Sequence, residues 1–67
     1  LKSWRKRDRT FRLLKIQLIL WKAPQGIRVA DIARKCNVRV RTVYRDLKDL
    51  EDELDAPVWE QGSLRGI

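Results

Sequence analysis

Arg41, Thr42 and Arg45 are the residues whose types and spacing are best suited to recognising a ligand. A guanidinium can form two parallel hydrogen bonds to O6 and N7 of guanine, and a threonine can bond a base edge or contact a thymine methyl group. On a helix that turns 100° per residue, Arg41, Arg45 and Lys48 project between about 140° and 200° from Val43. The spacing therefore predicts one cationic helix face directed at a nucleic acid.

Each of these residues also has a purely structural interpretation. Arg41 and Arg45 are equally the types found on a solvated helix surface, and Thr42 is a type that bonds the backbone at a helix start. Tyr44, at the edge of the cationic face, suits either packing or a hydrogen bond from its hydroxyl to a phosphate. For Asp46 we expect an ion pair that holds a nearby arginine, because phosphates would repel a carboxylate.

The order of charges along this helix is unfavourable for the helix itself. The acids follow the arginines: Asp49, Glu51, Asp52, Glu53 and Asp55. A helix macrodipole prefers acids in the first turn and bases in the last, by about 0.3–1 kcal/mol for each exposed charge. The reversed order indicates that the helix serves a partner rather than its own stability.

The charge of the whole chain is polarised in the same sense. Residues 1–48 hold 15 basic groups and three acids, whereas residues 49–67 hold one basic group and six acids. The net charge is +7. Charge added only for solubility is normally interspersed by sign, so the separation favours an anionic polymer as the partner.

Composition argues against catalysis, metal binding and membrane insertion. The chain has 67 residues, no histidine, no methionine and one cysteine, Cys36. The lack of histidine excludes a histidine-containing triad and, together with the single cysteine, the usual zinc frameworks. A single cysteine also excludes an intrachain disulfide. The longest uncharged stretch, 16–21, is far shorter than a membrane span, and the basic opening does not read as a signal peptide. We therefore expect a cytoplasmic protein without enzymatic activity or cofactor. The absence of an initial methionine and the end at Gly66-Ile67 suggest a domain of a longer protein.

Apolar periodicity predicts three helices, over about 9–22, 30–36 and 40–54. The first has two apolar rows, with Thr10 as a possible cap. We assign the row Phe11, Leu14, Leu18 and Trp21 to the core, and the opposite row Leu13, Ile16 and Leu20 to a second contact. The other two helices have one apolar face each, formed by Val29, Ile32, Ala33 and Cys36 and by Val43, Leu47, Leu50 and Leu54.

Only Asn37, Val38 and Arg39 separate the second and third helices. So short a connection forces a steep crossing, with Asn37 suited to the left-handed conformation and Val38 pointing into the crossing. This is helix-turn-helix spacing, in which the second helix enters the major groove. Ile27–Val29 and Val58–Glu60 are expected to be short strands, with Trp59 packing at the second, and the residues from Leu64 onward begin a returning strand.

The segment from Val29 to Leu50, above all the run Arg-Thr-Val-Tyr-Arg-Asp-Leu at 41–47, resembles the winged helix-turn-helix of bacterial DeoR-type regulators. It is more similar still to the N-terminal domain of WYL-domain transcriptional regulators. Arg-Leu-Leu at 12–14 also resembles that family's first helix, and the match covers about residues 9–67.

The resemblance implies a mainly α fold, a three-helix winged helix-turn-helix with a short, partly truncated β-hairpin wing. Residues 1–8 form a basic N-terminal arm, 9–67 the DNA-binding domain, 40–54 the recognition helix, and the wing starts at about residue 58. The candidate DNA contacts are Arg39, Val40, Arg41, Thr42, Tyr44, Arg45, Lys48 and, in the wing, Arg65. Double-stranded DNA is the implied partner of a homodimer formed through regions partly outside this chain, with Leu13, Ile16 and Leu20 as candidate contacts.

The family usually has serine where this chain has Arg39, and a serine would cap the recognition helix. Losing such a cap costs roughly 0.5–2 kcal/mol. We therefore expect either a frayed first turn or an offsetting contact between Arg39 and a phosphate.

Two other functions stay open at this point. The basic segment from Lys2 to Arg12 is compatible with an RNA-binding or single-strand-binding module, although such modules stack bases on exposed aromatics and only Trp4 and Tyr44 are available. The second apolar row of the first helix is compatible with a winged-helix module that binds another protein.

Overall fold

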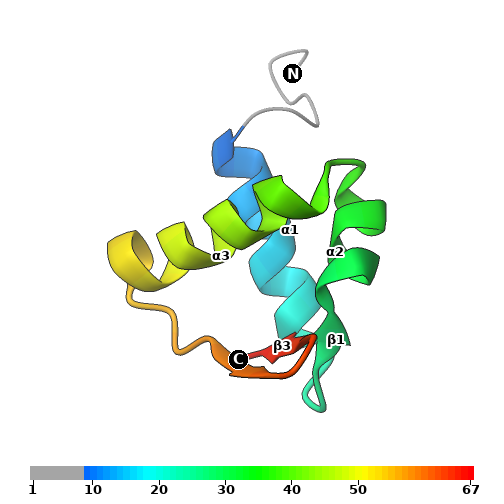
Figure 1. The fold of residues 1–67 in the computed structure, drawn as a ribbon. Helices are drawn as coiled ribbons and strands as arrows, with labels where there is room; N and C mark the ends of the chain where they lie inside the picture. The colour runs from blue at the N-terminus through cyan, green and yellow to red at the C-terminus, as the bar shows by residue number, and fades with distance from the viewer. Residues whose placement is uncertain (1–8) are drawn as a thin grey trace.

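Three helices enclose one apolar core, and a small sheet closes one end of it (Figure 1). The computed structural model describes residues 9–67. The elements, in order, are α1 (Arg9–Trp21), β1 (Ile27–Arg28), α2 (Val29–Cys36), α3 (Val40–Leu54), β2 (Trp59–Gln61) and β3 (Leu64–Gly66). The predicted mainly helical winged helix-turn-helix is confirmed. The expected basic arm, with Trp4, lies outside the described residues.

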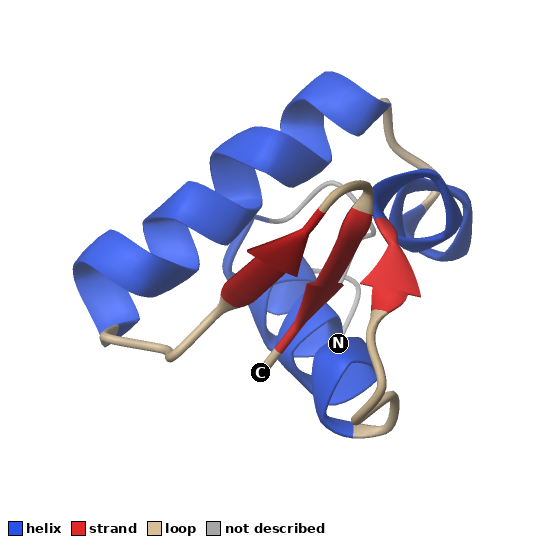
Figure 2. Ribbon diagram, turned by 60° about the horizontal axis from the view of Figure 1, so that its bottom comes forward, coloured by secondary structure: helices blue, strands red, loops and turns tan. Residues whose placement is uncertain are grey.

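The wing is an antiparallel hairpin that also pairs with β1. The strand order in the sheet is β1-β3-β2, so β3, the last strand along the chain, lies between the other two (Figure 2). Ile27 pairs with Arg65, and Trp59 pairs with Gly66. The half-buried indole of Trp59 covers Gly66, where a Cβ would overlap the ring. The hairpin thus has both strands, where the sequence predicted only the beginning of the second.

The two apolar rows of α1 have the opposite roles from those predicted. Leu13, Ile16 and Leu20 are buried in the core with the predicted faces of α2 and α3. On the other row, Leu18 is 57% exposed and Trp21 is 72% exposed. The assignment of this row to the core was therefore wrong, as was the use of Leu13, Ile16 and Leu20 as a partner contact. A domain this small has one core, and α2 and α3 cover only one side of α1.

Two smaller expectations at helix ends were also wrong. Leu54 is 51% exposed, because α3 extends past the core in its last turn. Thr10 lies inside α1, so it is not the residue that caps this helix, since a cap residue has non-helical backbone angles.

The turn between α2 and α3 has the predicted geometry. Asn37 adopts the left-handed conformation, with φ 57° and ψ 47°, and its N–H donates to the carbonyls of Ala33 and Arg34 at the end of α2. Val38 is half-buried and packs against the core. These contacts fix the direction in which α3 leaves the turn.

Cys36 is buried in the core, as its place on the apolar face of α2 predicted. Burial raises the pKa of its thiol above the ordinary value of 9.0. Because the unfolded chain then loses the thiol proton first, this group lowers the stability of the fold only as the pH rises above about 9.

An ion pair joins α1 to α3 at the edge of the core. Nε of Arg12 donates to one carboxylate oxygen of Asp46, and Nη2 donates to the other at 3.1 Å. The side chain of Asp46 is 1% exposed and that of Arg12 is 12% exposed. The hydrogen bond to Asp46 raises the pKa of the Arg12 guanidinium. The predicted pairing of Asp46 with an arginine is confirmed, and the partner lies on α1.

Replacing Asp46 with alanine should lower the free energy of unfolding by about 3 kcal/mol, because it removes the buried carboxylate that pairs with the Arg12 guanidinium. Urea unfolding followed by circular dichroism measures this loss. Asp52→Ala is the matched control, since it breaks an exposed pair on the same helix, between Lys48 and Asp52. Equal unfolding midpoints for the two variants would contradict the role given to Asp46.

Candidate nucleic-acid interface

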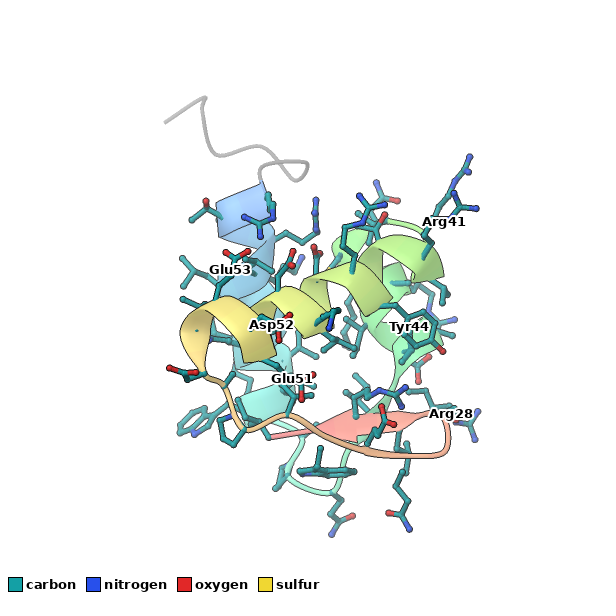
Figure 3. The ribbon with its side chains drawn as sticks, turned by 60° about the vertical axis from the view of Figure 1, so that its left-hand side comes forward. Arg28, Arg41, Tyr44, Glu51, Asp52 and Glu53 are labelled. Atoms are coloured by element: carbon teal, nitrogen blue, oxygen red, sulfur yellow. The ribbon has the colours of Figure 1, made fainter. Side chains whose placement is uncertain are left out.

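The first two turns of α3 present a cationic surface to solvent. Arg41, Arg45 and Lys48 are exposed, as their projection around the helix predicted, and Tyr44 is 48% exposed beside them. Figure 3 shows Arg41 and Tyr44 at this end of the helix. We call Arg41, Tyr44, Arg45 and Lys48 the basic face of α3. Four of the predicted contact residues are thus brought together on one helix.

The remaining candidates on and before α3 are placed less centrally. Arg39 and Val40, at the start of the helix, are both exposed, and Val40 is 40% exposed. Thr42 is half-buried. Its N–H donates to the carbonyl of Arg39 at 2.9 Å, within the first turn.

Adjacent helices of this chain have opposite charge orders. In α2 the acid Asp31 lies in the first turn and the bases Arg34 and Lys35 lie in the last, as the macrodipole favours. In α3 the first turn contains no acid and the last contains no base. Of the two helices of the helix-turn-helix, only α3 therefore has the unfavourable order.

The acids of α3 divide between two directions. On the α1 side, Arg9 donates to Asp49 at 2.9 Å and to Glu53 at 3.0 Å, and these hydrogen bonds raise the pKa of Arg9. On the solvent side, Asp52 lies 3.4 Å from Lys48. Figure 3 shows Glu51, Asp52 and Glu53 at the end of α3 away from Arg41. An anionic ligand is therefore favoured at one end of α3 and disfavoured at the other.

The first turn of α3 lacks a side-chain cap, as expected from the arginine at position 39. Arg39 is the N-cap residue, with φ −80° and ψ 154°, and its side chain makes no capping hydrogen bond. The turn is nevertheless closed by the backbone, since Thr42 and Val43 both donate to the carbonyl of Arg39. Of the two alternatives expected for Arg39, the frayed first turn is therefore not seen.

Arg65 does not lie at the tip of the wing. The hairpin turns at Gly62-Ser63, and Arg65 is in the middle of β3 with a side chain that is 12% exposed. Its Nη1 donates to the carbonyls of Gly62 and Leu64, each at 2.8 Å. Its Cζ lies 5.6 Å from the centre of the Tyr44 ring. Arg65 is thus placed behind the basic face rather than on it.

Arg28 is an exposed cation that the sequence analysis did not single out. It is the N-cap residue of α2 and also makes no side-chain capping bond. In Figure 3 it lies on the same side of the molecule as Arg41 and Tyr44. Its position immediately before the first helix of the helix-turn-helix was the signal that could have identified it.

A second surface lies at the opposite end of α3. The exposed row of α1 and the residues after α3 form a groove of about 690 Å³. We call it the apolar groove; its lining is Leu14, Gln17, Leu18, Trp21, Leu54, Asp55, Ala56, Pro57 and Ile67. Its apolar character and its position beside the acidic end of α3 make it unsuited to a nucleic acid.

Within residues 9–67 no group of three or more acidic or cysteine side chains is arranged to hold a metal ion. In the same part of the chain no helix is long and apolar enough to cross a membrane.

Helix, three-residue turn, helix and paired hairpin together define a winged helix-turn-helix domain. A family model described as "HTH domain" matches residues 12–61, so the chain belongs to this HTH domain family. Such domains bind DNA and serve in transcription regulation. No curated protein and no solved structure matches the chain.

Introducing a side-chain cap at the start of α3 should change the stability of the fold and the affinity for a duplex in opposite directions. Arg39→Ser should raise the free energy of unfolding by about 1 kcal/mol, because its hydroxyl can accept a hydrogen bond from the first turn. Arg39→Ala removes the same charge without supplying a cap, so it should not stabilise. Both variants should weaken duplex binding to the same extent if Arg39 contacts a phosphate. Thermal unfolding and fluorescence anisotropy measure the two effects, and a serine variant no more stable than the alanine variant would contradict this account.

Proposed function

We propose that residues 9–67 bind double-stranded DNA with sequence specificity, as the DNA-binding domain of a bacterial transcriptional regulator of the WYL or DeoR type. In this proposal α3 lies in the major groove. The observation that carries it is the basic face at the start of a helix whose charge order is unfavourable for its own stability. The resemblance of residues 41–47 to the WYL branch supports the narrower assignment, and it implies action in the cytoplasm.

The basic face can contact bases and phosphates at once. Arg41 and Arg45 are exposed on successive turns, the spacing at which two guanidinium groups reach neighbouring base pairs from one helix. Thr42 lies beside them. Lys48, Arg39 and the hydroxyl of Tyr44 surround this pair and are assigned to phosphates, which position the helix without reading sequence. Val40 supplies an apolar contact at the helix start.

A single-strand or RNA-binding function is less well supported by the described residues. Such modules need adjacent exposed aromatic side chains on which bases stack. Between residues 9 and 67 the exposed aromatics are Tyr44 and Trp21, which lie on different helices. Trp21 belongs to the apolar groove, beside the acidic end of α3. This arrangement favours a duplex.

We also propose that the homodimer implied by the resemblance uses the apolar groove. Leu14, Leu18 and Trp21 follow one helical stripe, and a two-fold contact would cover this stripe on both copies together. A second copy suits the surface better than DNA, because the acidic side chains of Glu53 and Asp55 are exposed next to it. A contact there leaves the basic face free.

Alanine substitution of Arg41 or Arg45 should weaken binding to a preferred duplex by about 1–3 kcal/mol and relax the base preference at one position. The duplex is first obtained by selection from a random library, and binding is measured by anisotropy across a salt series. For the wild type, affinity should fall with salt at a slope of about −0.9 for each phosphate neutralised.

Lys22→Ala is the matched control for these variants, since it removes an exposed cation just after α1. It should leave the selected site and the affinity nearly unchanged. If Lys22→Ala lowered the affinity for the duplex as much as Arg41→Ala does, then net charge, and not the basic face, would determine binding. A selection that returns no consensus would rule out sequence specificity.

A charge in the apolar groove should dissociate the dimer. Leu18→Lys places an ammonium group in the middle of the stripe, so sedimentation equilibrium should show a monomer where the wild type is a dimer. Because Leu18 is already 57% exposed, the circular dichroism spectrum should not change. A wild type that stays monomeric at high concentration, or a dimer that survives Leu18→Lys, would remove this assignment.

A further inference from the structure

The wing and α3 meet at one pair of side chains, Arg65 and Tyr44. The Arg65 guanidinium lies over the Tyr44 ring, with Cζ 5.6 Å from the ring centre. A cation at this distance from an aromatic face is attracted by the ring quadrupole, and the attraction increases when the cation is shielded from water. The Arg65 side chain is 12% exposed, so this contact is well shielded.

The guanidinium is also held by the wing itself. Nη1 donates to the carbonyls of Gly62, in the turn, and of Leu64, in the strand. Nη2 lies 3.5 Å from the carboxylate of Glu60, the residue paired with Arg65 across the hairpin. These three acceptors fix the plane of the guanidinium, which limits the positions open to the Tyr44 ring.

The same pair borders a small recess between α3 and the wing. The recess has a volume of about 230 Å³, and its lining includes Tyr44, Lys48, Glu51, Trp59 and Arg65. Without Arg65, the Tyr44 ring would have room to turn into this space and away from the exposed surface.

We propose that Arg65 is a positioning residue for DNA binding, which holds the Tyr44 ring so that its hydroxyl faces the duplex. This inference rests on the function proposed above. It differs from the role expected for Arg65 from the sequence, which was a direct DNA contact in the wing, at a phosphate or in the minor groove. Nη1 of Arg65 donates to two wing carbonyls and the side chain has little exposed surface, whereas Tyr44 is half-exposed at the edge of the basic face.

The two roles of Arg65 predict different salt dependences. A direct phosphate contact contributes about 0.9 to the slope of log affinity against log salt, and its loss lowers the slope by that amount. A positioning residue contributes nothing to the slope. Arg65→Gln should therefore weaken binding to the selected duplex roughly fivefold, as the loss of one ordered contact would, with the salt slope unchanged.

A double-mutant cycle with Tyr44 tests whether Arg65 acts through the ring. Tyr44→Leu removes the ring, so Arg65→Gln should have no further effect in that background. Arg65→Lys keeps the charge but not the planar fork, and it should recover only part of the affinity. A lower salt slope in Arg65→Gln that Arg65→Lys restores, or additive losses in the double variant, would overturn the proposal in favour of a direct contact.

A spectroscopic measurement on the free protein completes the test. Tyr44 is the only tyrosine of the chain, so incorporation of 3-fluorotyrosine gives a single ¹⁹F resonance. Arg65→Gln should shift or broaden this resonance, while Lys22→Ala should not. An unchanged resonance in a variant that unfolds at the wild-type temperature would also overturn the proposal. If the wild type binds no duplex even at low salt, the proposed function is wrong. If the wild type binds and Arg65→Gln binds with the same affinity, only the role proposed for Arg65 is wrong.

Discussion

The orientation of α3 depends on the buried ion pair between Arg12 and Asp46. Asp46 immediately follows Arg45 in sequence, so the rotation that buries its carboxylate also turns Arg45 outward. Rotating α3 by one residue, about 100°, would bring Arg45 or Leu47 in place of Asp46 to the Arg12 guanidinium and disturb the core position of Val43. A buried ion pair adds little net stability compared with apolar residues of the same volume, but breaking it is costly. Its value here is that it specifies one orientation.

The fixed orientation of α3 determines which of its charged side chains face α1 and which face solvent. Asp49 and Glu53 lie toward α1 and are paired with Arg9, which leaves the arginines of the first two turns without acids beside them. The neighbouring helix α2, with Asp31 early and Arg34 late, follows the macrodipole preference. A sequence under selection for folding alone would not treat two adjacent helices in opposite ways. The basic face is therefore best understood as a binding surface.

The sequence predicted the helices, the turn and the exposed cations because each depends on local spacing. It did not predict which apolar row of α1 is buried, since both rows have spacings of three and four residues. The partner of Asp46 would have resolved this. Arg12 lies about 40° from Ile16 around the helix but about 120° from Leu18. An arginine buried against α3 thus requires the Ile16 row to face the core. Long-range pairing of this kind, like the contact of Arg65 with Tyr44, leaves no periodic signal.

In the proposed homodimer, the exposed row of α1 is part of the function rather than a defect of the core. It lies with Leu54 and Ile67 next to the acids that end α3, while Arg41 and Arg45 occupy the other end of the same helix. One helix thus separates a cationic surface suited to phosphates from an apolar, acid-bordered surface suited to protein. Because α3 is fixed through Asp46 and continues into the wing, a partner bound at the apolar groove would sit at a defined position relative to the duplex. In the proposed homodimer, the geometry of α1 and α3 would contribute to the spacing of the two half-sites.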